Sequence, residues 1–166
     1  MNGLSEASVL FPAWSRGAWC DGDQQPLPGR VCSGEDLLSA FVQASPRWVD
    51  SLLRWRDRLV APLGLKVAAA PLSALMPGQR WAVGDRLGVF RLLHLDAREA
   101  VLGEDDRHLD FRLSLMHQDG MLRVVTLVRT HNLAGQVYLR LVTPFHHLIA
   151  GVMIRRMREH LLAPLV

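Results

Sequence analysis

The segment Arg107–His131 constrains the fold most, because it specifies a β-hairpin together with its register. Apolar and polar residues alternate from Arg107 to Met116, as expected for a strand with one buried face. Asp119-Gly120 is a strong signal for a two-residue hairpin turn, and Met121–His131 supplies the return strand. This turn predicts an apolar face on which four pairs lie opposite one another: Leu109 with Thr130, Phe111 with Val128, Leu113 with Thr126, and Leu115 with Val124.

The other face of this hairpin is polar. The same turn places His108 opposite His131, and Asp110 opposite Arg129, so that two opposite charges attract across the strands. Two histidines and a carboxylate also suggest a metal site. Because Arg129 would neutralise Asp110 and discourage a dication, we expect a polar sheet face and no bound metal.

Further short elements precede the hairpin. Ser33 and Asp36 form a capping-box-like start for a helix over Ser33–Ala44. Proline is tolerated in the first turn, so a second helix is predicted from about Pro46 to Ala61. Its apolar stripe is formed by Trp48, Leu52, Trp55 and Leu59, and we expect its tryptophans to be core residues. Strands are predicted near Val67 and over Gly88–Leu95 and Arg98–Gly103.

A long helix is predicted to follow the hairpin, from about Ala134 to Leu162. Its apolar stripe contains Leu139, Val142, Ile149, Met153 and Met157, and His146 lies at the centre of this stripe. Pro144 removes one helical hydrogen bond, to Arg140, and is expected to kink the helix. Such a kink would let the helix bend across a curved antiparallel sheet, so the sequence predicts an α+β fold.

Three groups of residues resemble the bacterial domain of unknown function 2867. They are Pro46-Arg47-Trp48-Val49 with Arg56-Asp57-Arg58-Leu59-Val60 and Gly64-Leu65; Gly103-Glu104-Asp105-Asp106 followed by His108-Leu109-Asp110-Phe111-Arg112; and His131-Asn132 with Gly135, Tyr138 and Pro144-Phe145-His146. The resemblance spans roughly Gly17 to Arg158. That family is similar to the START and plant-pollen-allergen (SRPBCC) helix-grip superfamily.

The resemblance implies a helix-grip fold, in which a curved antiparallel sheet wraps around a long C-terminal helix. It also implies a first strand near Ala18–Leu27, followed by the two short helices. Residues 1–16 would then be an N-terminal extension, and 17–166 a single domain. The resemblance implies no established activity and no cofactor, and the chain has no Gly-x-Gly-x-x-Gly run for a dinucleotide.

Two polar residues face the apolar side of predicted helices, and they are the sharpest candidates for a site. Arg56 lies in the apolar half of its helix, and His146 lies in the stripe of the long helix. In helix-grip folds the space between sheet and long helix is often a ligand cavity, which Trp55, Phe111 and Leu113 would line. Arg56 would hold an anion there, and His146 would exchange a hydrogen bond or a proton. The alternative is that both side chains have only a structural role and bond to other groups of the protein. This alternative is favoured, because buried polar groups usually have hydrogen-bond partners within the protein.

The charge pattern argues against nucleic acid as a partner. Of the 19 Lys and Arg residues, all except Lys66 are arginine, and they are dispersed among acids without stacking aromatics.

The richest apolar run, Leu133–Ile154, contains Arg140 and two histidines, so we expect no membrane span. No secretion signal is visible, and two cysteines are too few for a disulfide framework, so we expect a cytoplasmic protein with free Cys20 and Cys32.

We therefore expect a binding module for a small apolar or amphipathic ligand. One alternative is an enzyme that resembles the cyclases or hydratases of the superfamily, with His146 as acid or base. Asp105-Asp106 is a further candidate pair of catalytic carboxylates, although adjacent acids in such a turn are usually solvated. Another alternative is a homodimer that forms through a sheet face or through Leu4–Trp14, whose Val9-Leu10-Phe11 has no obvious partner.

Overall fold

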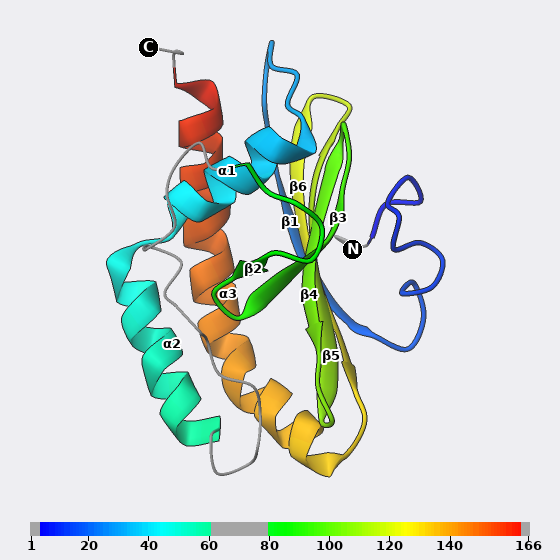
Figure 1. Cartoon of the computed structure of the whole chain (residues 1–166), viewed down its shortest axis with the longest axis vertical. Coiled ribbons are helices and arrows are strands. Elements are labelled where there is room, and N and C mark those ends of the chain that lie inside the picture. The colour runs from blue at the N-terminus through cyan, green and yellow to red at the C-terminus, as the bar shows by residue number, and fades with distance from the viewer. Residues whose placement is uncertain (1–3, 61–79, 164–166) are drawn as a thin grey trace.

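A computed structural model describes residues 4–60 and 80–163. In this part of the chain the elements are β1 (Trp19–Pro26), α1 (Gly34–Ala44), α2 (Arg47–Val60), β2 (Arg86–Leu87), β3 (Phe90–Leu95), β4 (Glu99–Asp105), β5 (Leu109–Gln118), β6 (Met121–Thr130) and α3 (Leu133–Leu162). The strands form one antiparallel sheet in the order β1-β6-β5-β4-β3-β2. The helices lie on one side of this sheet and the N-terminal segment on the other (Figure 1). The fold is α+β in the predicted helix-grip arrangement, including the first strand that the family resemblance implies.

The β5–β6 hairpin has the predicted register. Leu109 pairs with Thr130, Asp110 with Arg129, and the ladder continues without a shift to Gln118 and Met121. Asp119 and Gly120 both have positive φ, of 52° and 69°, as a tight hairpin turn requires.

The expected ion pair between Asp110 and Arg129 is replaced by other contacts. Asp110 Oδ2 lies 3.0 Å from His131 Nε2, and the Arg129 guanidinium donates to the carbonyl of Ala13 at 2.9 Å. The register prediction was correct, but the N-terminal segment supplies a second set of acceptors that the strand pairing alone does not reveal.

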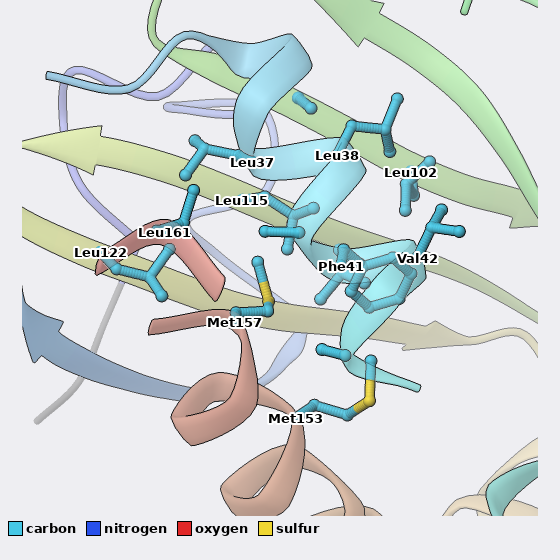
Figure 2. Packing of buried hydrophobic residues seen from close by; sticks show 14 of the residues in the cluster. Leu37, Leu38, Phe41, Val42, Leu102, Leu115, Leu122, Met153, Met157 and Leu161 are labelled. Atoms are coloured by element: carbon cyan, nitrogen blue, oxygen red, sulfur yellow. The ribbon is translucent and has the colours of Figure 1, made fainter. Parts of the chain in front are cut away.

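One half of the inner sheet face carries a filled core. Helix α1 begins at the predicted capping box, in which the Ser33 side chain accepts from Asp36 N and the Asp36 side chain accepts from Ser33 N. Its apolar side packs against the C-terminal half of α3 and against the sheet (Figure 2). The residues that meet there are Leu37, Leu38, Phe41, Val42, Leu102, Leu115, Leu122, Met153, Met157 and Leu161.

The other half of the inner face is covered differently from the prediction. Trp48 and Trp55 of α2, expected in the core, are 40% and 64% exposed. The first half of α3 also carries exposed apolar side chains, which are Leu133, Val137, Leu141, Phe145 and Leu148. The predicted α3 stripe is correct at its C-terminal end, where Met153 and Met157 are buried in the core. The tryptophans of the predicted α2 stripe do not meet a filled core. The predicted helix end at Ala61 and the strand predicted near Val67 lie outside the described residues.

Pro144, at which the sequence predicts a kink, lies inside helix α3. The helix bends along its course across the sheet (Figure 1). Proline lacks the N–H that would bond to the Arg140 carbonyl. One residue earlier, the Thr143 hydroxyl donates to the Leu139 carbonyl at 2.6 Å. By length and composition alone α3 could also cross a membrane, a criterion that core helices of soluble proteins meet as well. In this structure its second half packs against α1 and the sheet.

The N-terminal segment covers part of the outer face of the sheet. Leu10, predicted to lack a partner, is buried there against Val101, Val125 and Leu127. Its neighbour Glu99 is 1% exposed. The Glu99 carboxylate accepts hydrogen bonds from Ser8 Oγ at 2.6 Å, Val9 N at 2.9 Å and Ser114 Oγ at 2.6 Å.

Further along this segment, the Trp14 ring contacts two arginines of the hairpin. The guanidinium carbons of Arg112 and Arg129 lie 4.7 Å and 4.5 Å from the ring centroid, within cation–π distance. Residues 4–16 therefore pack as an integral layer of the domain.

Two glycines of α3 provide a matched test of this packing. A Cβ at Gly135 would collide with the His108 backbone carbonyl, whereas a Cβ at Gly151 would meet nothing within 4 Å. We expect Gly135→Ala to lower the free energy of unfolding by about 2 kcal/mol. Gly151→Ala should raise it by about 0.5–1 kcal/mol through helix propensity alone. Urea unfolding of both variants measures the difference, and equal stabilities would contradict the close approach of α3 to the His108 backbone.

Removing the Glu99 side chain should destabilise the domain. Glu99→Ala leaves two buried hydroxyls and the Val9 N–H without their acceptor, which should cost about 3 kcal/mol. Glu6→Ala, at an exposed position of the same segment, should change stability by less than about 0.5 kcal/mol. Thermal unfolding of the two variants tests whether the N-terminal segment contributes to the fold.

Candidate functional site

A cavity of about 1180 Å³ lies between the inner face of the sheet, α2 and the first half of α3. Its sheet side is lined by apolar residues of β5 and β6, which are Leu109, Phe111, Leu113, Val124 and Val128. Helix α2 contributes Trp48, Leu52 and Trp55. Helix α3 contributes Val137, Tyr138, Leu141, Val142, Phe145 and His146. The exposed apolar sides of the two helices are therefore walls of this cavity.

The structure brings together most of the candidate residues named from the sequence. Trp55, Phe111, Leu113 and His146 all line the cavity, and they come from three elements, α2, β5 and α3. Arg56 belongs to α2, but its side chain lies outside the described residues. Its proposed role as an anion ligand therefore stays a prediction.

His146 is held at the β1 side of the cavity by an acid. Its Nε2 lies 3.1 Å from Asp21 Oδ2, and His147 Nε2 lies 3.7 Å from the same oxygen. The Trp19 ring meets His146 edge to face, with centroids 5.4 Å apart. Burial lowers the pKa of His146, while the charge of Asp21 and its hydrogen bond oppose that shift. The ring is therefore fixed in position by two residues of one strand.

Sequence reasoning missed Trp19 and Asp21. They lie two residues apart on β1, opposite Val128 and Thr126 of β6, and those two residues line the cavity. Side chains alternate along a strand, so Trp19 and Asp21 share one face. The strand itself was expected only from the family resemblance, and its register to β6 is the signal that would have placed both residues beside α3.

Acids lie at the opposite side of the cavity, on the β4 side of the sheet. Glu104 and Asp106 both line it, and Glu104 Oε2 lies 3.3 Å from Arg86 Nη2. Asp105 is exposed and accepts from Arg112 Nη1 at 2.6 Å. Asp105 thus ends strand β4 and is exposed, whereas Asp106 follows the strand and lines the cavity, so the two acids have different surroundings.

The polar residues of the hairpin lie apart from the cavity. Buried His108 contacts Asn132 Oδ1 through Nδ1 at 3.2 Å, while Asp110 contacts His131. Arg129 bonds to the N-terminal segment. Among the side chains that the structure describes, no group of three or more His, Cys, Asp or Glu is arranged to hold a metal ion.

The arrangement defines an α+β helix-grip domain with an apolar cavity between sheet and helices. The chain belongs to the family described as "Protein of unknown function (DUF2867)", whose sequence model matches residues 15–153. No curated protein and no solved structure matches the chain.

The pKa of His146 predicts a pH dependence of stability. An unfolded histidine titrates near its ordinary value of 6.5, but burial lowers the value in the folded protein. Between the two values the unfolded chain binds more protons, so stability is fully present above about pH 6.5 and falls as the pH decreases. We expect the melting temperature of the wild type to drop more than that of His146→Phe between about pH 7.5 and about pH 5.5.

Asp21→Asn is the matched variant for this experiment. Asp21 raises the pKa of His146, so removing its charge should make the loss of stability on acidification steeper than in the wild type. Identical pH profiles for the wild type and His146→Phe would show that His146 is not the titrating group.

Proposed function

We propose that this chain is a binding domain for a small apolar or amphipathic ligand, held between the sheet and helices α2 and α3. The observation that carries the proposal is the cavity of about 1180 Å³ with its largely apolar lining. Similarity to the START and pollen-allergen superfamily, in which this space often holds a ligand, supports the same function. The proposed ligand contacts are Trp55, Phe111, Leu113 and His146, with Arg56 as a further candidate.

The size of the cavity favours an occupant over an incompletely packed core. Protein interiors are close-packed, with few voids larger than a water molecule, because side chains beside a void lose dispersion contacts. Pockets for small ligands occupy roughly 300–1,000 Å³ and are mostly apolar with a few polar groups. A ligand would also cover apolar side chains such as Trp55 and Leu141, which are exposed in the described structure.

The second candidate is an enzyme of the same superfamily type, with His146 as acid or base. The observation that favours it is the hydrogen bond from His146 to Asp21 at the cavity wall, since a carboxylate commonly orients a catalytic imidazole. A homodimer remains an alternative, but Leu10 of the N-terminal segment already packs within its own chain. We propose a cytoplasmic location, which the free Cys20 and Cys32 support.

Filling part of the cavity should weaken ligand binding without unfolding the domain. Ala150 of α3 lines the cavity, whereas Ala97 is exposed in the turn between β3 and β4. Nile red, an uncharged apolar dye, serves as the ligand probe. We expect Ala150→Phe to weaken dye binding at least about tenfold, because the ring takes the space of the ligand.

The matched control is Ala97→Phe, which adds the same ring outside the cavity and should bind dye like the wild type. Circular dichroism and thermal unfolding establish that both variants are folded. Equal dye affinity in the wild type and Ala150→Phe, or no saturable binding to the wild type, would defeat the proposed function.

A further inference from the structure

The hydrogen bond between His146 and Asp21 determines what His146 offers to a ligand. Asp21 Oδ2 is an acceptor, so His146 Nε2, at 3.1 Å, carries the proton and donates. A neutral imidazole has one N–H, which leaves Nδ1 as an acceptor with a free lone pair. None of the side chains that the structure describes forms a hydrogen bond with Nδ1, and the ring belongs to the cavity wall.

The surroundings of the ring keep it neutral and in place. Burial lowers the pKa of His146, so at neutral pH it keeps one proton, and Asp21 selects the nitrogen that carries it. Trp19 packs edge to face against the ring. The groups that face His146 are thus an acid and an indole from β1, with His147 beside it on α3.

Resting on the proposed function, we propose that the ligand is an amphipathic alcohol whose hydroxyl donates a hydrogen bond to His146 Nδ1. Its apolar body lies along the β5 and β6 side chains, against Phe111 and Leu113. Asp21 is a positioning residue in this assignment, because it makes Nδ1 the acceptor without touching the ligand.

The charges around the cavity favour a hydroxyl over a carboxylate. Among the described residues that line the cavity there is no lysine or arginine, while Glu104 and Asp106 are acids. A carboxylate would meet the lone pair of Nδ1, with Asp21 beyond the same ring, and would lose its hydration without gaining a cation. A hydroxyl has the donor that Nδ1 lacks and carries no charge to desolvate.

The test compares three compounds with the same chain: dodecanol, its methyl ether and dodecanoate. Each is titrated against Nile red bound to the wild-type protein, at neutral pH. We expect dodecanol to bind about three- to tenfold more tightly than the ether, the usual net effect of one hydrogen bond, and dodecanoate to bind more weakly than dodecanol.

The variants then locate the hydrogen bond. His146→Phe should reduce the ratio of alcohol to ether affinity to about one. Asp21→Asn should lower this ratio through the tautomer of His146, and Asp21→Glu should partly restore it. His147→Phe is the matched control, because His147 neighbours the same acid but is not part of the cavity wall, and should retain the wild-type ratio.

The possible failures are distinguishable. If no compound displaces the dye, or the dye does not bind, the proposed function and this assignment both fail. If the ether matches the alcohol in the wild type, or His146→Phe retains the preference, the domain still binds apolar ligands but the hydroxyl contact is wrong. Tighter binding of dodecanoate than of dodecanol would likewise contradict an alcohol as the ligand. Arg56 would then be the residue to test as the ligand of an anion.

Discussion

The register of the β5–β6 hairpin is the constraint on which the rest of the structure depends. It places Leu109, Phe111, Leu113 and Leu115 on the inner face of the sheet, together with their partners on β6. A slip of one residue would move this whole set to the outer face, where the N-terminal segment packs. The positive φ angles of Asp119 and Gly120 secure the turn, so a local signal determines both the core and the cavity wall.

The inner face that results is filled at one end and hollow at the other. Leu115 and Leu122 meet α1 and the C-terminal half of α3, where Met157 and Ile154 are almost fully buried. Towards the start of α3 the cavity lies between helix and sheet, and Phe111 and Val128 line it. Because the same strands serve both ends, the filled core can hold the cavity wall rigid without a ligand being present.

The hairpin, the capping box of α1 and the long helix could be predicted because each depends on residues close together in the sequence. The exposure of Trp48 and Trp55 could not, since helical periodicity shows which side is apolar but not what lies opposite. His146 was found from its place in the α3 stripe, whereas its partner Asp21 lies 125 residues away and needs the sheet register. The contact of Leu10 with Leu127 is of the same long-range kind.

The two halves of helix α3 therefore differ in what they contact. Its second half buries Met153, Ile154, Met157 and Leu161, and such burial contributes about 1.5–3 kcal/mol for each side chain. Its first half places Tyr138, Phe145 and His146 at the cavity wall, where side chains gain few packing contacts. Side chains in the first half can thus change at little cost in stability, whereas the second half must keep its shape. Anchoring one half in the core lets a single helix both complete the fold and carry His146 at the cavity wall.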